Sequence, residues 1–124
     1  MMFDLEPAEA RLLLNVALMA TGRNRFRSAA KLLAALERFR PDDIAIANAK
    51  AISLISAMKF AEAVAFIDGE GLSRFPDSAM LKAFKGMALI RMERMNEAEV
   101  SLREAAEQTR DPAAAKLAGD LLKG

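Results

Sequence analysis

The sequence predicts an all-helical fold of repeated helix pairs, and three observations support this prediction. Alanines recur at positions 29, 63 and 98, with spacings of 34 and 35 residues. A bulky apolar residue precedes each alanine by three positions and another follows it by four, as on one face of a helix. No segment alternates apolar and polar residues with a period of two, so no β-sheet is expected.

The composition argues against several classes of function. The chain has 124 residues, of which 53% are hydrophobic and 28% charged, as in one compact domain. It has no Cys and no His, which removes thiolate chemistry, the commonest metal ligand and the usual general base. A net charge of +1 and the absence of Trp and Tyr argue against nucleic-acid binding. We therefore expect a single domain over residues 1–124 that mediates protein interactions and has no catalytic, cofactor or metal site.

Proline and glycine mark the first helix pair. Pro7 suits the first turn of a helix, where its missing N–H has no partner to lose. This helix is predicted over residues 7–21 and ends at Thr21-Gly22, because glycine is common at helix C-termini. The second helix is predicted over residues 25–39 and ends before Pro41.

The second and third helix pairs each follow a Pro-Asp dipeptide. Asp42 and Asp77 come directly after prolines and are the expected N-caps. The four helices of these pairs are predicted over residues 43–57, 60–73, 78–91 and 95–109. Gly69 and Gly71 lie late in the second pair, where the chain has one extra residue, and we expect them to end that helix.

A last, unpaired helix is predicted over residues 112–122. Pro112 can occupy its first position, and Asp111 is the expected N-cap. A helical repeat exposes an apolar surface at its end, so a terminal helix is needed to cover that surface.

The repeat resembles the tetratricopeptide repeat, a 34-residue helix–turn–helix unit with a small residue near the start of its second helix and a proline at its end. The three repeats in this register cover residues 10–43, 44–78 and 79–112. The small residue of each first helix falls on Ala17, Ala51 and Gly86. The resemblance implies a tetratricopeptide-like solenoid of three helix pairs plus a C-terminal capping helix.

The first helix of each repeat lines the concave face of tetratricopeptide domains, and in this sequence the residues at those positions are mostly apolar. The candidate partner-binding residues, carried over by position, are Leu14, Leu18, Ile52, Ile55, Met80, Ala83, Met87 and Ile90. A contiguous apolar patch usually marks a partner. We expect the apolar face of an amphipathic helix to bind there. The alternatives are a second copy of the chain, the last helix folding back, or simple core packing.

One known function of three-repeat domains is excluded by the same positions. A clamp for a C-terminal carboxylate uses Lys and Asn in the first repeat and Lys and Arg in the third repeat. This chain has Leu14 and Leu18 at the first pair of positions, and Met80 and Phe84 at the second. We therefore do not expect it to bind a carboxylate terminus.

The chain as a whole resembles the small tetratricopeptide chaperones that hold the needle subunit of bacterial type III secretion systems. The shared features are the length, the Thr21-Gly22 turn, the Phe75-Pro76-Asp77 stretch and the Asp111-Pro112 helix start. The resemblance implies a cytoplasmic chaperone that prevents premature polymerisation by covering an amphipathic helix of the needle subunit, together with a small co-chaperone. The alternative is a general tetratricopeptide interaction scaffold, possibly a homodimer.

Three further expectations concern location and packing. No apolar run reaches the roughly 20 residues of a membrane span, and Asp4, Glu6 and Glu9 stand where an export signal has basic residues. Both observations favour the cytoplasm. Phe26 is expected to be the buried anchor of a solvated, arginine-rich turn, and Met95 is expected to belong to the core.

Overall fold

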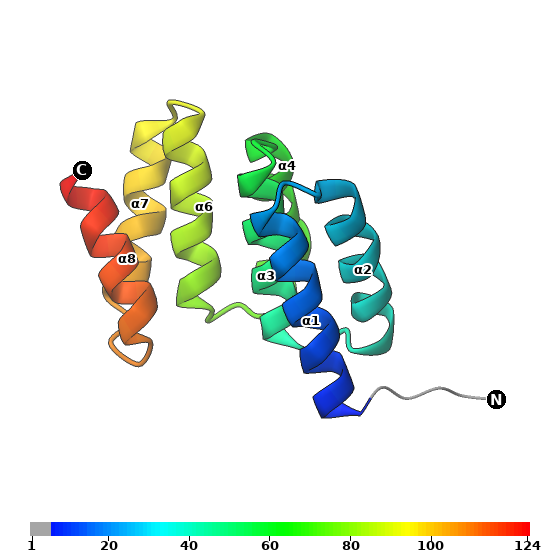
Figure 1. Cartoon of the computed structure of the whole chain (residues 1–124). Coiled ribbons are helices and arrows are strands. Elements are labelled where there is room, and N and C mark those ends of the chain that lie inside the picture. The colour runs from blue at the N-terminus through cyan, green and yellow to red at the C-terminus, as the bar shows by residue number, and fades with distance from the viewer. Residues whose placement is uncertain (1–5) are drawn as a thin grey trace. The chain divides into compact units, whose positions relative to one another are not determined.

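The computed structural model describes residues 6–124, and this part of the chain is helical with no strand (Figure 1). The structure is 80% helical, which confirms the all-helical fold class predicted from the sequence. The chain divides after Met58 into two compact units. The prediction that residues 1–124 form a single domain stays a prediction.

The first unit consists of three helices that all contact one another. They are α1 (Pro7–Gly22), α2 (Phe26–Phe39) and α3 (Ile44–Ser56). The core of the unit is built from Ala10, Ala17, Leu33, Leu36, Ile46 and Ala49. The buried Thr21 hydroxyl lies 3.0 Å from the Ala17 carbonyl oxygen and 3.2 Å from the Ser53 hydroxyl, which joins α1 to α3.

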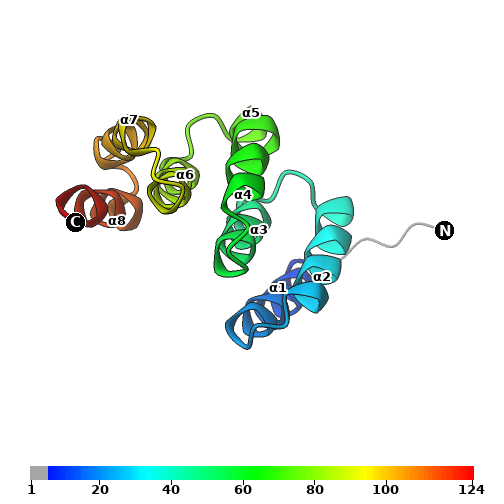
Figure 2. The same cartoon turned by 90° about the horizontal axis from the view of Figure 1, so that it is seen from above.

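The second unit is arranged around one central helix. Its elements are α4 (Phe60–Phe66), a π-helical turn η1 (Ile67–Gly71), α5 (Leu72–Arg74), α6 (Ala79–Arg91), α7 (Met95–Ala106) and α8 (Pro112–Lys123). Helix α6 contacts α4, α7 and α8. Figure 2 views α6, α7 and α8 nearly end-on, where they form a triangle.

The alanines of the repeat and the bulky residues that follow them pack as predicted, whereas the bulky residues that precede the alanines do not. Ala29, Ala63 and Ala98 are at most 1% exposed. The bulky residues that follow them by four, Leu33, Ile67 and Leu102, are also buried. Phe26, which was expected to be the buried anchor of its turn, is only partly buried, and the bulky residues at the equivalent positions, Phe60 and Met95, are not buried either.

The turn inside each helix pair contains one residue in the left-handed region of backbone space. These residues are Asn24, Met58 and Glu93, with φ angles of 62°, 62° and 61°. Their spacings of 34 and 35 residues match the repeat. Gly22 is the last residue of α1 and has no positive φ, so the turn relies on Asn24 instead. Asn tolerates this conformation, whereas Met and Glu do so at a steric cost of about 1–2 kcal/mol.

The extra residue of the second repeat lies in the π turn. Equivalent positions of the first two repeats are 34 residues apart up to Leu33 and Ile67, and 35 apart from Pro41 and Pro76 onward. A π turn contains one residue more than an α turn, and η1 falls within this interval. The expectation that Gly69 and Gly71 end the helix is therefore wrong, because the helix continues through them into α5.

The π turn also decides which residue faces the core. Gly71 is buried, and a Cβ atom at this position would lie 3.1 Å from Leu81 Cδ1. Its equivalent 35 residues earlier is the buried Leu36. Glu70, which stands 34 residues after Leu36, is exposed. The extra residue thus keeps a carboxylate out of the core.

Two predicted N-caps are displaced by one residue, and a third is confirmed. Asp43 accepts a hydrogen bond from the Ala45 amide at 3.0 Å, and the Ser78 hydroxyl accepts one from the Leu81 amide at 3.2 Å. These two residues cap α3 and α6, whereas Asp42 and Asp77 belong to the preceding turns. At α8, the predicted cap Asp111 accepts from the Ala114 amide at 3.1 Å. Helix α7 ends at Ala106, three residues earlier than expected.

We predict that Gly86→Ala destabilises the protein by about 1–3 kcal/mol, as overpacked cores do. A Cβ atom on Gly86 would clash with Cδ2 and Cγ of Leu102, which is only 1% exposed and has little room to move. Gly119→Ala is the matched control, because its Cβ meets nothing within 4 Å. That variant should gain about 0.5–1 kcal/mol from helix propensity. Chemical denaturation measures both, and equal effects would contradict the close approach of α6 and α7.

We predict that Met58→Gly stabilises the protein by about 1 kcal/mol. Glycine removes the steric cost of the left-handed conformation, and the Met58 side chain is 67% exposed, so little packing is lost. Met58→Ala should show no such gain, because alanine keeps the Cβ atom. If thermal melting ranks the alanine variant equal to the glycine variant, the proposed turn geometry is wrong.

Candidate partner-binding site

The four candidate residues of the first unit lie on two helices in contact. Leu14 is partly exposed and packs against the core of the unit, while Leu18 is 37% exposed. Ile52 and Ile55 on α3 are partly exposed. The hydrogen bond between Thr21 and Ser53 joins the helices next to Ile52 and one turn beyond Leu18. The first unit therefore keeps apolar surface at all four positions.

The candidate residues of the second unit all lie on α6, where α8 covers part of their side of the helix. Ala83 has no exposed surface and belongs to a core cluster with Ala79, Leu102, Ala105, Ala114 and Ala118. Met80 and Ile90 are partly buried against the same cluster, whereas Met87 is partly exposed and lies outside it. Ala83 is thus core in the free chain, which matches the alternative in which the last helix packs on the predicted face.

The position of α8 follows from its sequence. Ala114 and Ala118 are four residues apart and lie on one side of the helix. Both are completely buried. Side chains this small allow α8 to come close to α6, and this closeness leaves no surface at Ala83.

A pocket that was not predicted from the sequence lies at one end of the second unit, and its lining is part apolar and part charged. It has a volume of about 280 Å³ and is lined by Ile90, Met95, Ala98, Glu99, Leu102, Arg103, Leu121 and Leu122. Met95 is 57% exposed, so its expected place in the core is wrong. Met95 begins α7, and Ala98, one turn later, takes the buried position instead. The adjacent leucines of the last helix, Leu121 and Leu122, are the feature of the sequence from which this pocket could have been predicted.

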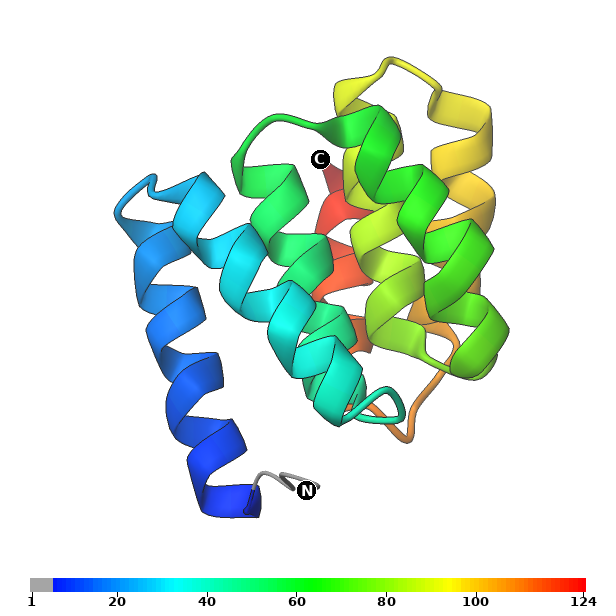
Figure 3. The same cartoon turned by 90° about the vertical axis from the view of Figure 1, so that its right-hand side faces the viewer.

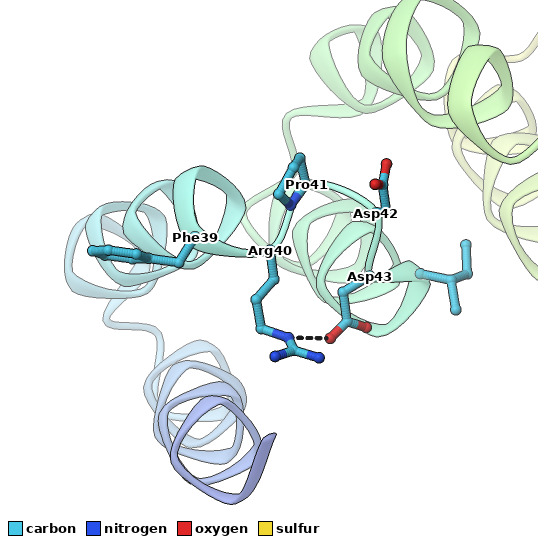
Figure 4. A pocket seen from close by; sticks show the side chains of 6 residues that line it. Phe39, Arg40, Pro41, Asp42 and Asp43 are labelled. Atoms are coloured by element: carbon cyan, nitrogen blue, oxygen red, sulfur yellow. Dashed lines mark hydrogen bonds and ion pairs between the residues drawn. The ribbon is translucent and has the colours of Figure 1, made fainter. Parts of the chain in front are cut away.

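A second hollow lies at the turn between α2 and α3 (Figure 4). Its volume is about 520 Å³, and its lining is the continuous segment from Phe39 to Ile44. Phe39 is 51% exposed at its edge, and Arg40 Nε lies 3.3 Å from Asp43 Oδ2. Asp43 also caps α3, so these charges already serve to hold the turn.

One exposed ion pair at the start of α7 shifts the pKa values of both its members. Two hydrogen bonds of 2.6 Å join the Arg94 guanidinium to the Glu97 carboxylate. These bonds lower the pKa of Glu97 and raise the pKa of Arg94. Because both groups are exposed, the pair favours the start of the helix without marking a reactive centre.

Among residues 6–124, one buried side-chain polar atom has no hydrogen-bond partner, and it belongs to Asn48. Asn48 occupies a concave-face position of the second repeat, on α3, one turn before Ile52. Its Oδ1 atom is buried and accepts no hydrogen bond from any residue between 6 and 124. Because this atom is buried within the free chain, it belongs to the packing of α3 and not to the exposed surface at the candidate positions.

The described part of the chain contains neither a metal-binding cluster nor a membrane-spanning helix. No three carboxylates of residues 6–124 are placed to hold a metal ion. None of the helices in that range is both long and apolar enough to cross a bilayer. Comparisons with protein-family models, curated proteins and solved structures find no match. The fold and the placement of these side chains define an all-helical, repeat-like protein.

We predict that Ala83→Glu and Met87→Glu differ sharply in stability. The first variant places a carboxylate in a closed apolar cluster, and an unpaired buried charge costs about 3–5 kcal/mol. The second adds a carboxylate at a partly exposed position, where we expect a loss below about 1 kcal/mol. Urea denaturation followed by circular dichroism measures both. Equal losses would mean that α8 does not cover α6 as described.

Proposed function

We propose that this protein is a chaperone that binds an amphipathic helix of a type III secretion needle subunit and keeps that subunit from polymerising. The observation that carries the proposal is that each of the two units keeps exposed apolar side chains at concave-face positions of the repeat. Leu18, Ile52, Ile55 and Met87 keep exposed area. Burial of such area against a partner helix is the main source of affinity in helix-in-groove complexes.

The physical requirement of the proposed partner matches this chemistry. A subunit that polymerises presents an apolar helix to its neighbours, and that helix must be covered until assembly. An apolar surface covers it through side-chain packing, without catalysis, a metal or a cofactor. A small co-chaperone would complete the complex, and the proposal places it in the cytoplasm.

A general interaction scaffold is the second candidate function. The burial of Ala83 by α8 favours it, because this burial shortens the apolar surface that α6 offers to a long helix. In that case the pocket that includes Ile90 and Leu121 would accept a single apolar side chain of a different partner.

We predict that Ile52→Glu and Met87→Glu each weaken binding of the needle subunit's C-terminal helix by about 30-fold or more. Each substitution would bury an unpaired charge in the complex, and central anchors typically contribute 2 kcal/mol or more. Co-expression with the needle subunit of the same organism tests complex formation, and calorimetric titration with the helix as a synthetic peptide measures the affinity.

Val100→Glu is the matched control for this prediction. Val100 is 59% exposed on α7, away from the concave-face positions, so the variant should bind like the parent chain. If all three variants bind equally, the binding face is wrong. If the parent chain forms no complex with the subunit, the chaperone function is wrong and the scaffold is favoured.

A further inference from the structure

Helix α1 exposes a second apolar side that the repeat register does not use. Leu12, Val16 and Met19 are 64%, 46% and 57% exposed. Spacings of four and three residues put them on one side of the helix. The buried residues Ala10 and Ala17 lie on the other side. Figure 3 shows α1 along the edge of its unit, with α2 and α3 to one side.

A charged residue continues this apolar stripe at each end. Glu9 stands three residues before Leu12, and Arg23 stands four residues after Met19. Both charged residues are exposed. They are equally far, seven residues, from Val16 at the middle of the stripe. The stripe is therefore acidic at one end, apolar in the middle and basic at the other end.

We propose that two copies of this chain associate through α1 in antiparallel orientation. With the two-fold axis at Val16, Leu12 of each copy lies near Met19 of the other, and Glu9 lies near Arg23. Both ends of the contact then pair opposite charges. A parallel pairing would instead place Glu9 beside Glu9 and Arg23 beside Arg23, which is unfavourable. The charge pattern selects a second copy because the stripe is complementary to itself.

The size of the stripe implies weak association. The 16 residues of α1 rise about 24 Å, and a strip about 10 Å wide covers a few hundred Å² on each copy. This total lies below the roughly 1,200 Å² of a standard interface. We expect a monomer–dimer equilibrium that sedimentation resolves only at high protein concentration.

Charge reversal at the two ends provides the sharpest test. Arg23→Glu puts two like-charged pairs into a homodimer, and Glu9→Arg does the same with the opposite sign. Each single variant should dimerise at least about tenfold more weakly than the parent chain. Mixing the two variants restores opposite charges at both ends, so the mixture should associate at least as well as the parent. The double variant Glu9→Arg/Arg23→Glu should also recover dimerisation.

Sedimentation equilibrium of the full chain at low salt measures all five samples. Glu9 also accepts a hydrogen bond from the Glu6 amide at 3.2 Å, so the folding of each variant is checked by circular dichroism. Val16→Glu, at a partly exposed position on the two-fold axis, should abolish the dimer while the chain stays folded. A parent chain that stays monomeric at millimolar concentration overturns the proposal. Dimerisation that ignores both charge reversals overturns it as well, because a different face must then mediate it.

Discussion

Close approach between helices, made possible by residues with little or no side chain, is the constraint on which both units depend. Gly86 lets Leu102 of α7 lie against the backbone of α6. Ala114 and Ala118 do the same for α8, and Ala17 for α1. Interiors packed at crystal-like density leave no space for a larger residue at such a crossing. Small residues at the crossings thus let large side chains such as Leu33 and Leu102 be buried between the helices.

The chain path was predictable wherever a residue restricts the backbone by itself. Pro7, Pro41 and Pro112 delimit helices, so the helix ends near them agree with the structure. The caps at Asp43 and Ser78 were missed by one residue because the choice depends on how many residues the turn takes up after the proline. The burial of Ala83 was not predictable from the repeat register, because the register describes each repeat by itself and carries no information about the path of α8.

Helix α1 carries apolar residues on sides that meet different surroundings. Ala10 and Ala17 pack inside the unit, Leu18 belongs to the proposed partner site, and Leu12 and Val16 lie on the outer edge. The outer residues show the spacing of an amphipathic helix, a signal present in the sequence that a search restricted to concave-face positions passes over. Because Leu18 and Val16 lie on different sides of the helix, dimerisation through one side leaves the other accessible.

The π turn has a consequence for how such a chain can change in length over evolution. A residue inserted into an α-helix rotates every later side chain by about 100° around the axis, which would turn buried positions outward. Here the wide turn absorbs the insertion within η1, so Phe75 and Ser78 occupy the places that Arg40 and Asp43 have one repeat earlier. The positions of buried residues along the repeat are therefore kept by helix geometry and not by a fixed number of residues. The length of a repeat can change in this way while its buried contacts are retained.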